Sequence, residues 1–435
     1  MTRTLTKDLS VHIGETVTLK GWLHKKRLLG GLNFITLRDR SGLAQSLVDS
    51  KDELEKLRGL QIGTVFALTG QVVADERAPG GAELHDVTVE VLVPVTDEPP
   101  IEIDKPIDHK SENLDTLFEY RVLNIRNLQE QKIFKIRSSI TRYMREYLQN
   151  NEFQEIDTPK LLAEATEGGA EVFKLDYFGK TATLAQSPQL YKQIMVGAFE
   201  RVFEIGHSYR AEPSATTRHL TELTMLDIEM GFVESHDEVM DMVGGMVRNA
   251  LTRVYEEHAD DLKSLNAPAL KLSEDGSIPR FTVAEIHELY TKGTGTDTTE
   301  EKDLTPDEER WIAAYALKNH GSDLVYATDF PAEAGKFYHK FKDEEGTVAW
   351  ADLLYRGLEI STVPLRENNY EKMLAQMTRA GLDVNAEGFK YYLQAFKYGL
   401  PTHGGCGLGV DRVVQKTIGL ANVKEAVLFP RDINR

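Results

Sequence analysis

Two strand-like stretches within residues 201–230 flank a polar loop that carries Arg210, Arg218 and His219. In the second stretch, alternation puts apolar side chains on one face and a mixed set on the other. The mixed face carries Leu223, Met225, Asp227 and Glu229. Because unpaired buried charge is costly, carboxylates that repeat on one face need partners. Arginines beside carboxylates suit a ligand that bears phosphates and an ammonium group, whereas the alternative is a solvated hairpin with surface ion pairs.

A glycine-rich run near the C-terminus indicates close approach of the backbone to a ligand. It reads Gly404-Gly405-Cys406-Gly407-Leu408-Gly409-Val410-Asp411-Arg412. It is neither a Walker loop nor a GxGxxG motif, because no Gly-Lys-Ser/Thr follows and position 410 is Val. The glycines would let the backbone approach a flat ligand, with Arg412 at the start of a helix that points at it. The alternative is a tight structural turn.

Asp352 and Glu359 flank the sequence Tyr355-Arg356-Gly357. If this segment is a hairpin that turns at Arg356-Gly357, the two carboxylates come together. Neighbouring carboxylates repel unless a cation joins them, and hard oxygen ligands suit magnesium. On the residues alone, two exposed acids beside a turn is the default interpretation, and a Mg²⁺ site is the alternative.

The scaffold around these residues has ordinary globular composition. The 435 residues are 41% hydrophobic and 28% charged, which predicts two or three domains. We expect no signal or membrane segment, and Cys406, the single cysteine, fits a reducing cytoplasm. The net charge of -18 argues mildly against bulk nucleic-acid binding, but residues 20–40 are locally basic. That basic run is either a contact patch or a solvated face.

The order of elements predicts an α+β protein with two domains and a connecting segment. Five short strands in residues 1–100 are typical of a small barrel such as an OB-fold. Prolines mark residues 101–130 as a hinge. In residues 131–435 a helix over 131–150 is followed by strands and helices without a βαβ rhythm, which favours an antiparallel sheet. Residues 256–320 are acidic and are expected to form a surface insertion.

Three segments resemble the motifs of class II aminoacyl-tRNA synthetases in their usual order. The helix over 131–150 with Pro159 resembles motif 1, the dimer-forming element; residues 201–229 resemble motif 2 and residues 404–412 motif 3. Within that class the chain resembles the archaeal-type aspartyl-tRNA synthetases over essentially its whole length. Residues 186–193, Gln-Ser-Pro-Gln-Leu-Tyr-Lys-Gln, match that family's amino-acid pocket. Ser187 and Gln189 are expected two apart on one strand face, with Lys192 one helical turn later.

The resemblance implies a role for each matching residue. Arg210 and Arg412 are the implied catalytic residues. The implied ATP-binding residues are Arg210, Glu212, Arg218, His219, Leu223, Glu359, Gly409 and Arg412. The implied aspartate-binding residues are Glu167, Ser187, Gln189, Lys192, Asp227 and Arg366. Glu167 belongs to a loop that closes over the amino acid. The implied magnesium ligands are Asp352, Glu359 and Thr362.

The implied reaction is the formation of aspartyl-adenylate from L-aspartate and ATP, followed by transfer to tRNA. Catalysis of this kind rests on positioning and charge neutralisation. The resemblance also implies a homodimer. Two alternatives stay open, an asparaginyl-tRNA synthetase and a class II paralogue that does not charge tRNA. Lys192 speaks against the first, because a buried ammonium pairs with a β-carboxylate and not with an amide.

The chain departs from the family pattern at three places. Leu223 replaces the aromatic residue that stacks on adenine, and Val363-Pro364 replaces the small residues that precede the arginine of the pocket. Gly335-Lys336 replaces the usual Arg-Pro ahead of Phe337-Tyr338.

Anticodon reading is assigned by the resemblance to the N-terminal barrel. Its implied anticodon-binding residues are His24, Arg27, Phe34, Gln45, Pro79 and Glu83. RNA bases in loops are read by stacking and by their edges, which suits Phe34 with Arg27 and Gln45. The aspartate and asparagine anticodons differ in the third base. The family's selective lineages tend to carry Trp and Lys where this chain has His24 and Pro79, so the resemblance predicts that both tRNA(Asp) and tRNA(Asn) are charged.

Overall fold

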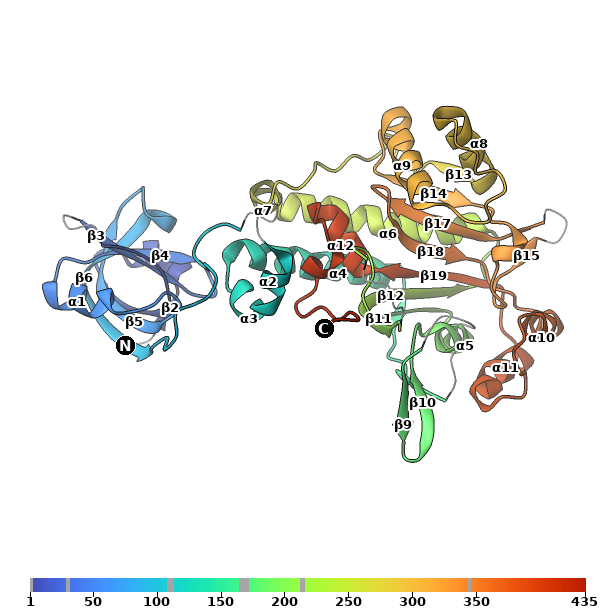
Figure 1. Ribbon diagram of the computed structural model, residues 1–435, viewed down its shortest axis with the longest axis horizontal. Coiled ribbons are helices and arrows are strands. Elements are labelled where there is room, and N and C mark those ends of the chain that lie inside the picture. The colour runs from blue at the N-terminus through green and yellow to red at the C-terminus, as the bar shows by residue number, and fades with distance from the viewer. Residues whose placement is uncertain (1–2, 29–31, 108–112, 164–171, 212–215, 343–345) are drawn as a thin grey trace. The chain divides into compact units, whose positions relative to one another are not determined.

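The computed structural model describes residues 3–28, 32–107, 113–163, 172–211, 216–342 and 346–435 (Figure 1). The chain divides into two compact units, Met1–Gln131 and Lys132–Arg435. Within the described residues, no helix is long and apolar enough to cross a membrane.

The first unit contains a closed β-barrel. Its strands are β1 (Arg3–Thr4), β2 (Thr16–Leu28), β3 (Asn33–Arg38), β4 (Leu43–Leu47), β5 (Val65–Ala74) and β6 (Ala82–Val93). β2 closes the barrel because it pairs with β3 on one side and with β5 on the other, in a sheet of order β1-β2-β3-β4-β6-β5. Inward side chains alternate along β2, where Val17, Leu19 and Leu23 are buried. The five predicted strands and the barrel class are confirmed.

Short helices complete the first unit. They are η1 (Thr6–His12), α1 (Lys51–Arg58), η2 (Pro79–Gly81), α2 (Leu114–Glu119) and α3 (Arg121–Asn124). α2 and α3 lie in the segment expected as a hinge. Arg121 there is buried and donates hydrogen bonds to Asn124 and Glu130, so the segment carries an internal ion pair.

The second unit is built on a sheet of order β13-β14-β17-β18-β19-β12-β11-β7. These strands are β7 (Gln154–Glu155), β11 (Arg201–Tyr209), β12 (Glu222–Gly231), β13 (Arg280–Thr282), β14 (Leu324–Thr328), β17 (Trp350–Tyr355), β18 (Glu359–Pro364) and β19 (His403–Gly409). All internal pairings are antiparallel, as predicted, whereas the two edge pairings, β13–β14 and β11–β7, are parallel.

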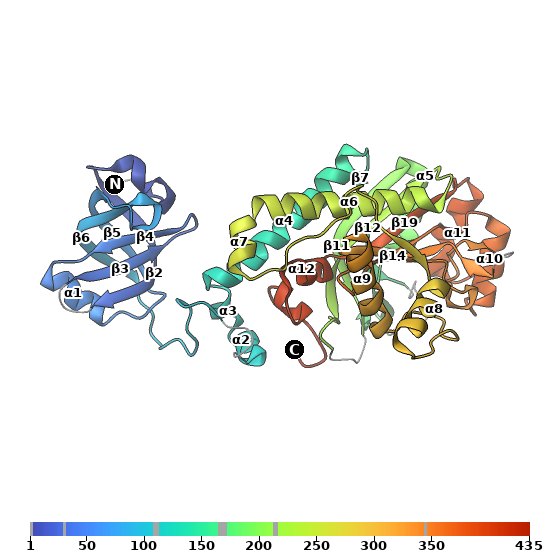
Figure 2. The ribbon, with the colours of Figure 1, turned by 90° about the horizontal axis from the view of Figure 1, so that it is seen from above.

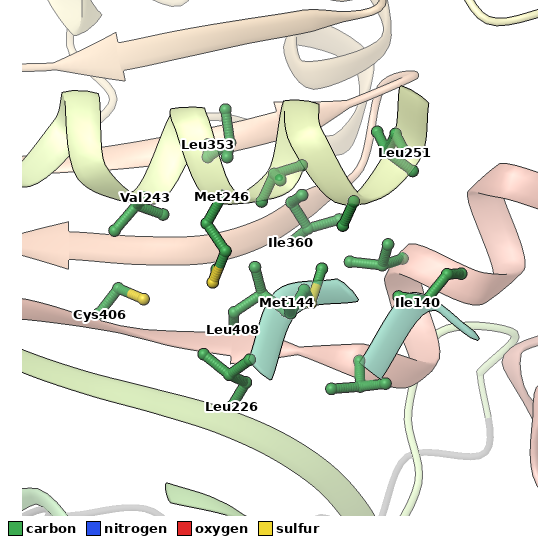
Figure 3. Packing of buried hydrophobic residues seen from close by; sticks show 14 of the residues in the cluster. Ile140, Met144, Leu226, Val243, Met246, Leu251, Leu353, Ile360, Cys406 and Leu408 are labelled. Atoms are coloured by element: carbon green, nitrogen blue, oxygen red, sulfur yellow. The ribbon is translucent and has the colours of Figure 1, made fainter. Parts of the chain in front are cut away.

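One face of this sheet is covered by long helices and forms the main core. α4 (Leu128–Asn150), α6 (His236–Glu257) and α12 (Val410–Ile418) supply its helical side chains. Figure 3 shows Cys406 and Leu408 of β19 packed below Val243 and Met246 of α6. Burial raises the pKa of the Cys406 thiol to about 12, which fits the small buried filler expected there.

On the opposite face, α8 (Val283–Thr294) and α9 (Pro306–His320) lie across the sheet from α6 (Figure 2). The helices α5 (Gln189–Phe199), α10 (Tyr370–Arg379), η4 (Glu387–Phe389) and α11 (Lys390–Lys397) share a separate apolar cluster. The helices α7 (Ala259–Ser264) and η5 (Val423–Ala426) add Leu262 and Ala426 to the main core, and η3 (Ala332–Ala334) is a single short turn. Outside the main sheet stand the short strands β8 (Leu161–Leu162), β9 (Lys174–Tyr177), β10 (Lys180–Leu184), β15 (Phe341–Lys342) and β16 (Thr347–Val348).

Residues 256–320 are not wholly a surface insertion. β13 pairs with β14 at the edge of the main sheet. Val283 and Ile286 of α8 and Ile312 of α9 are buried against Val325 and neighbouring residues of β14. Most acidic residues of this segment are exposed, but Glu308 is fully buried, where it accepts a hydrogen bond from Thr298. The high charge of the segment did not reveal the apolar side chains that its helices bury.

Candidate active site

A cavity of about 250 Å³ opens on the sheet face that α8, α9 and α5 flank. Strand alternation creates this face. On β12 the residues Leu226, Ile228 and Met230 point into the main core, so Met225, Asp227 and Glu229 point the other way. The face predicted for the second strand of residues 201–230 is therefore the wall of a pocket. It is not a solvated hairpin face.

The glycines of β19 give the pocket its depth. Gly405, Gly407 and Gly409 lie directly opposite Glu229, Asp227 and Met225 in the antiparallel register. A Cβ atom at Gly405 would lie 1.9 Å from the Ile228 carbonyl oxygen and 2.6 Å from Glu229 Oε2. A Cβ atom at Gly407 would lie 3.3 Å from Met225 Cε and 3.5 Å from Asp227 Oδ1, so side chains at Gly405 and Gly407 would crowd the carboxylates of β12. The glycine run is thus a strand that continues into α12, and the turn interpretation of residues 404–409 is wrong.

A buried cluster of two cations and two carboxylates forms one end of the pocket. Lys192 Nζ donates to Asp227 Oδ1 at 2.8 Å and to the Cys406 carbonyl at 2.8 Å, and lies 3.7 Å from Glu229 Oε2. Arg366 forms a two-point ion pair with Glu229, with distances of 2.9 and 3.1 Å. All four side chains are at most 3% exposed. The cluster is electrically balanced, so it can accept a ligand that carries both an ammonium group and carboxylates.

Burial and opposite charge act against each other in this cluster. Burial alone would raise the pKa of Glu229, but Arg366 and Lys192 lower it below its usual range. Glu229 was visible in the sequence through alternation but was not assigned to the site. Arg366 reaches the pocket although Val363-Pro364 precedes it, because β18 continues through Pro364 and Leu365 bridges to Gly404.

The structure corrects the placement of Ser187 and Gln189. They do not share a strand face: Ser187 precedes α5, Pro188 caps that helix, and Gln189 is its first residue. A proline before a helix favours this because its ring fixes φ at a value suited to a helix start. Lys192 follows in the first turn of α5, as predicted. Ser187 Oγ still lies 3.4 Å from Asp227 Oδ1, and both Ser187 and Gln189 line the cavity.

Arginines line the other end of the cavity. Arg412 Nη1 donates to the Glu359 carbonyl at 2.9 Å and to Glu359 Oε2 at 3.2 Å. Arg218 Nη1 donates to Glu309 Oε2 of α9 at 3.0 Å. Arg210 also lines the cavity. Glu309 was not predicted, because it belongs to the acidic segment whose charges were expected to face solvent.

Other predicted residues lie at the same end. His219, Leu223 and Gly409 line the cavity, so the predicted ATP-binding set converges there. Lys336, from the departure Gly335-Lys336, lines it as well. Glu167 and Glu212 lie outside the described residues.

Asp352 and Glu359 come from the two strands of a hairpin, β17 and β18, as predicted. The turn contains Arg356 and Gly357, whose φ values of 49° and 71° are left-handed. Thr362 Oγ1 donates to Glu359 Oε1 at 3.1 Å, and Asp352 accepts from the Trp350 indole at 2.7 Å. Burial, then repulsion from Glu359, raises the pKa of Asp352 well above its usual value. Burial also opposes charge on Glu359, but Arg412, Thr362 and Arg210 lower its pKa.

These oxygen donors fit a magnesium ion held jointly with phosphate oxygens. Two carboxylates that repel each other in a buried site are relieved by a hard cation, and Thr362 adds a neutral oxygen. Within the described residues no group of three or more His, Cys, Asp or Glu side chains is placed to hold a metal ion. Asp352, Glu359 and Thr362 would leave coordination positions of a magnesium ion open for phosphate oxygens or water.

The predicted anticodon residues form two rows on the outer face of the barrel. Phe34 pairs with Arg27 in the β2–β3 register. In the neighbouring row Gln45 pairs with Glu83, and Gln45 Nε2 donates to Glu83 Oε2 at 2.7 Å. Pro79 is exposed in η2, just before Glu83 on β6. An exposed cation, a ring and an amide–carboxylate pair can stack and read an unpaired base.

His24 occupies a different position from the rest of this set. It lies at the bulge of β2, between Leu23 and Lys25, where the register with β3 shifts. Burial and Arg38 lower the pKa of His24, opposed by Asp104. Lys26, from the locally basic run of residues 20–40, donates to carbonyl groups at the C-terminal end of α1 and just after it, those of Leu57, Arg58 and Leu60.

Comparison with protein families agrees with both units. A family model described as tRNA synthetases class II (D, K and N) matches residues 113–433, and an OB-fold nucleic acid binding domain matches residues 17–94. The sheet, the arginine-lined cavity and the barrel therefore belong to a class II tRNA synthetase.

Relatives at the level of sequence narrow this class. The chain is 39% identical to the aspartate–tRNA(Asp/Asn) ligase of Thermus thermophilus, over 100% of this chain and 99% of that protein. It is 38% identical to the aspartate–tRNA(Asp) ligase of Pyrococcus abyssi, over 99% and 97% of the two chains. Within class II, the chain belongs to the aspartate–tRNA ligase family.

Solved structures share the whole fold. The asparaginyl-tRNA synthetase of Pyrococcus horikoshii with asparaginyl-adenylate superposes with a TM-score of 0.91 at 30% identity, over 100% of this chain and 99% of that one. A putative aspartyl-tRNA synthetase from Leishmania major gives 0.89 at 27%, over 100% and 94%. The fold alone does not separate aspartate from asparagine enzymes, and the separation rests on the sequence relatives.

Proposed function

We propose that this enzyme attaches L-aspartate to both tRNA(Asp) and tRNA(Asn) through an aspartyl-adenylate. The observation that carries the amino-acid part is the buried cluster of Lys192, Asp227, Glu229 and Arg366. Lys192, Asp227 and Arg366 of this cluster line the same cavity as Arg210 and Arg412. A ligand with an ammonium group and a β-carboxylate matches the charges at one end. A triphosphate matches the arginines at the other.

In the first step the α-carboxylate of aspartate attacks the α-phosphorus of ATP, the bond to the bridging oxygen breaks, and pyrophosphate leaves. Asp227, with Ser187 and Gln189, binds the α-ammonium group, and Lys192 and Arg366 bind the β-carboxylate. Arg210 neutralises charge at the α-phosphate. Arg412, Arg218 and His219 hold the β- and γ-phosphates. Because these groups are fixed before the reaction, they stabilise the transition state without further rearrangement.

Asp352, Glu359 and Thr362 would hold magnesium, which when bound supplies charge neutralisation to the triphosphate. Arg218 must exchange its contact with Glu309 for a phosphate when ATP enters. The exchange is feasible because the guanidinium is about 30% exposed and burial raises the pKa of Glu309, which weakens that carboxylate as a competing anion.

In the second step the terminal adenosine hydroxyl of tRNA attacks the mixed anhydride and releases AMP. Selection between tRNAs is assigned to the barrel face that carries Phe34, Gln45 and Glu83. His24 and Pro79 replace the larger ring and the cationic side chain that would restrict the third anticodon base. A relative named for tRNA(Asp) alone and a relative named for both tRNAs match this chain at nearly equal identity, 38% and 39%. The proposal that both tRNAs are charged is therefore supported by His24 and Pro79 and not by overall sequence similarity.

The direct test is aspartylation of purified tRNA(Asp) and tRNA(Asn) side by side at one salt concentration, since tRNA affinity depends on salt. The expected result is a kcat/KM ratio within about tenfold, because the barrel, with His24 and Pro79, lacks the kind of contact to the third base that discriminates by roughly 1–3 kcal/mol. A preference for tRNA(Asp) of a thousandfold or more would refute charging of both. His24→Trp and Pro79→Lys, alone and together, should move the ratio toward tRNA(Asp).

We also propose that α4 forms the homodimer contact. The proposal rests on the resemblance of residues 131–150 to motif 1, and α4 keeps Lys135, Ser138 and Arg142 exposed for such a contact. Light scattering of the intact protein at micromolar concentration should give twice the 49.0 kDa chain mass. A monomer at that concentration would refute the assignment.

A further inference from the structure

A chain of buried amide and imidazole groups lies behind the amino-acid end of the pocket. Gln189 and Gln193 are one turn apart on α5, and Gln189 Nε2 donates to Gln193 Oε1 at 2.9 Å. Gln193 Nε2 lies 2.8 Å from His403 Nε2, and His403 Nδ1 lies 2.8 Å from the Pro401 carbonyl oxygen. Tyr392 OH also donates to Gln193 Oε1, at 3.1 Å. Gln193, His403 and Tyr392 are at most 1% exposed.

The chemistry of these groups gives the chain one direction. The Pro401 carbonyl can only accept, so His403 Nδ1 carries the proton. Burial lowers the pKa of His403, opposed by Glu229, so the ring is neutral and its Nε2 presents a lone pair. Only the NH₂ group of Gln193 can face that lone pair, and its carbonyl oxygen must then face Gln189 and Tyr392. Each link follows from the one before it.

The last link determines what Gln189 offers to the substrate. Its NH₂ group is taken by Gln193, so its carbonyl oxygen is the end left for the cavity, which Gln189 lines beside Ser187 and Asp227. An ammonium group needs acceptors, and a reversed amide would present it with a donor. We propose that Gln193 and His403 are positioning residues that fix the amide orientation of Gln189 and thereby the affinity for the α-ammonium group of aspartate. This inference rests on the proposed function.

Two substitutions at His403 separate hydrogen-bond direction from mere polarity. His403→Gln can place an acceptor where Nε2 stands, whereas His403→Asn reaches only the Nδ1 position and leaves Gln193 without its acceptor. The KM for aspartate in pyrophosphate exchange should rise roughly 10-fold to 100-fold in His403→Asn, the effect of losing a hydrogen bond to a charged group. His403→Gln should recover most of that loss. Gln193→Met, which removes the relay, should match His403→Asn.

Succinate is the matched probe for the ammonium group, because it has both carboxylates of aspartate and lacks the amine. Its inhibition constant should stay within about threefold across the variants while the KM for aspartate rises, since carboxylate binding does not involve the relay. A general distortion of the pocket would weaken both ligands. The KM for ATP should also stay within about threefold, and Gln415→Met, a buried glutamine outside the relay, serves as the control.

The charged groups around His403 are the same in these variants. They are Glu229 from β12 and Arg366 and Glu367 from the segment after β18, so they do not explain differences between Asn and Gln at position 403. Equal KM values for aspartate in His403→Asn, His403→Gln and Gln193→Met would overturn the inference, as would a parallel rise for succinate. Absence of aspartate-dependent exchange in the unsubstituted enzyme would instead overturn the proposed function.

Discussion

At the scale of single residues, Lys192 connects three parts of the site. Its ammonium group lies among Asp227, Glu229 and the Cys406 carbonyl, and it comes from α5 while those groups come from two strands. A buried cation in this position favours a second carboxylate over an amide, because an amide leaves part of the charge without a partner.

Substitution of Lys192 tests this role. Lys192→Ala should lower kcat/KM for aspartate in pyrophosphate exchange by at least a hundredfold, because removal of one partner from a buried ion pair costs about 3–5 kcal/mol. Lys174→Ala, an exposed lysine on β9, is the control. If Lys192→Ala stays within a few fold of the unsubstituted enzyme, Lys192 does not bind the β-carboxylate.

The role of Glu359 is tested by the magnesium concentration that adenylate formation requires. Glu359→Gln removes a charge that Arg412 and Thr362 now contact, so the magnesium concentration for half-maximal adenylate formation should rise about tenfold or more. Transfer from preformed adenylate to tRNA, measured in a single turnover, should change less. An unchanged magnesium requirement would remove Glu359 from the proposed metal site.

The family resemblance, and not residue types alone, predicted Lys192, Asp227, Arg412 and the Asp352–Glu359 pair, and the first three of these line the cavity. The residues that were missed, Glu229 as partner of Arg366 and Glu309 as partner of Arg218, are separated from those partners by many residues along the chain. Such pairs depend on how strands and helices are brought together, which neither periodicity nor local propensity encodes.

At the scale of elements, alternate residues of β19 face the main core and the cavity. Cys406 and Leu408 pack in the core with α6, whereas Gly407 and Gly409 line the cavity. The sequence showed the glycines but not that they lie on a strand. Glycine is common in turns and has a low strand propensity. In β19 it occurs in a strand because larger side chains would collide with β12 and fill the cavity.

Two alanine substitutions in β19 should affect different properties, the stability of the fold at Gly405 and the binding of aspartate at Gly407. Gly405→Ala places a Cβ atom 1.9 Å from the Ile228 oxygen, so β12 and β19 must separate, and we expect a loss of about 3 kcal/mol or more in unfolding free energy. At Gly407 the nearest atom is the flexible Met225 Cε at 3.3 Å, so Gly407→Ala should fold and raise the KM for aspartate. Thermal melting and exchange kinetics measure both. Equal stability of the two variants would contradict this account of β19.

The segment 256–320 shows why composition misled at this scale. Its acidic residues are real surface charges, yet α8 and α9 each bury one apolar stripe against β14, and α9 places Glu309 beside the pocket. A charged helix surface and a buried stripe coexist in an ordinary amphipathic helix.

At the scale of the whole molecule, the cavity proposed to activate the amino acid and the barrel proposed to read the anticodon lie in separate compact units. Changes on the barrel face should therefore affect tRNA charging without affecting adenylate formation. Phe34→Ala should lower kcat/KM for tRNA roughly 10-fold to 100-fold, because stacking of one base on an aromatic ring contributes about 1–3 kcal/mol. Pyrophosphate exchange without tRNA is the internal control. A similar fall in both reactions would contradict the division of labour.

The central claim is that this cavity activates aspartate. It is tested most directly by ATP–pyrophosphate exchange with the intact enzyme, with aspartate and asparagine measured in parallel. Exchange should depend on aspartate, with kcat/KM for asparagine lower by about a hundredfold or more, since an amide cannot replace the carboxylate that Lys192 and Arg366 bind. Exchange supported equally by asparagine, or by neither amino acid, would contradict it.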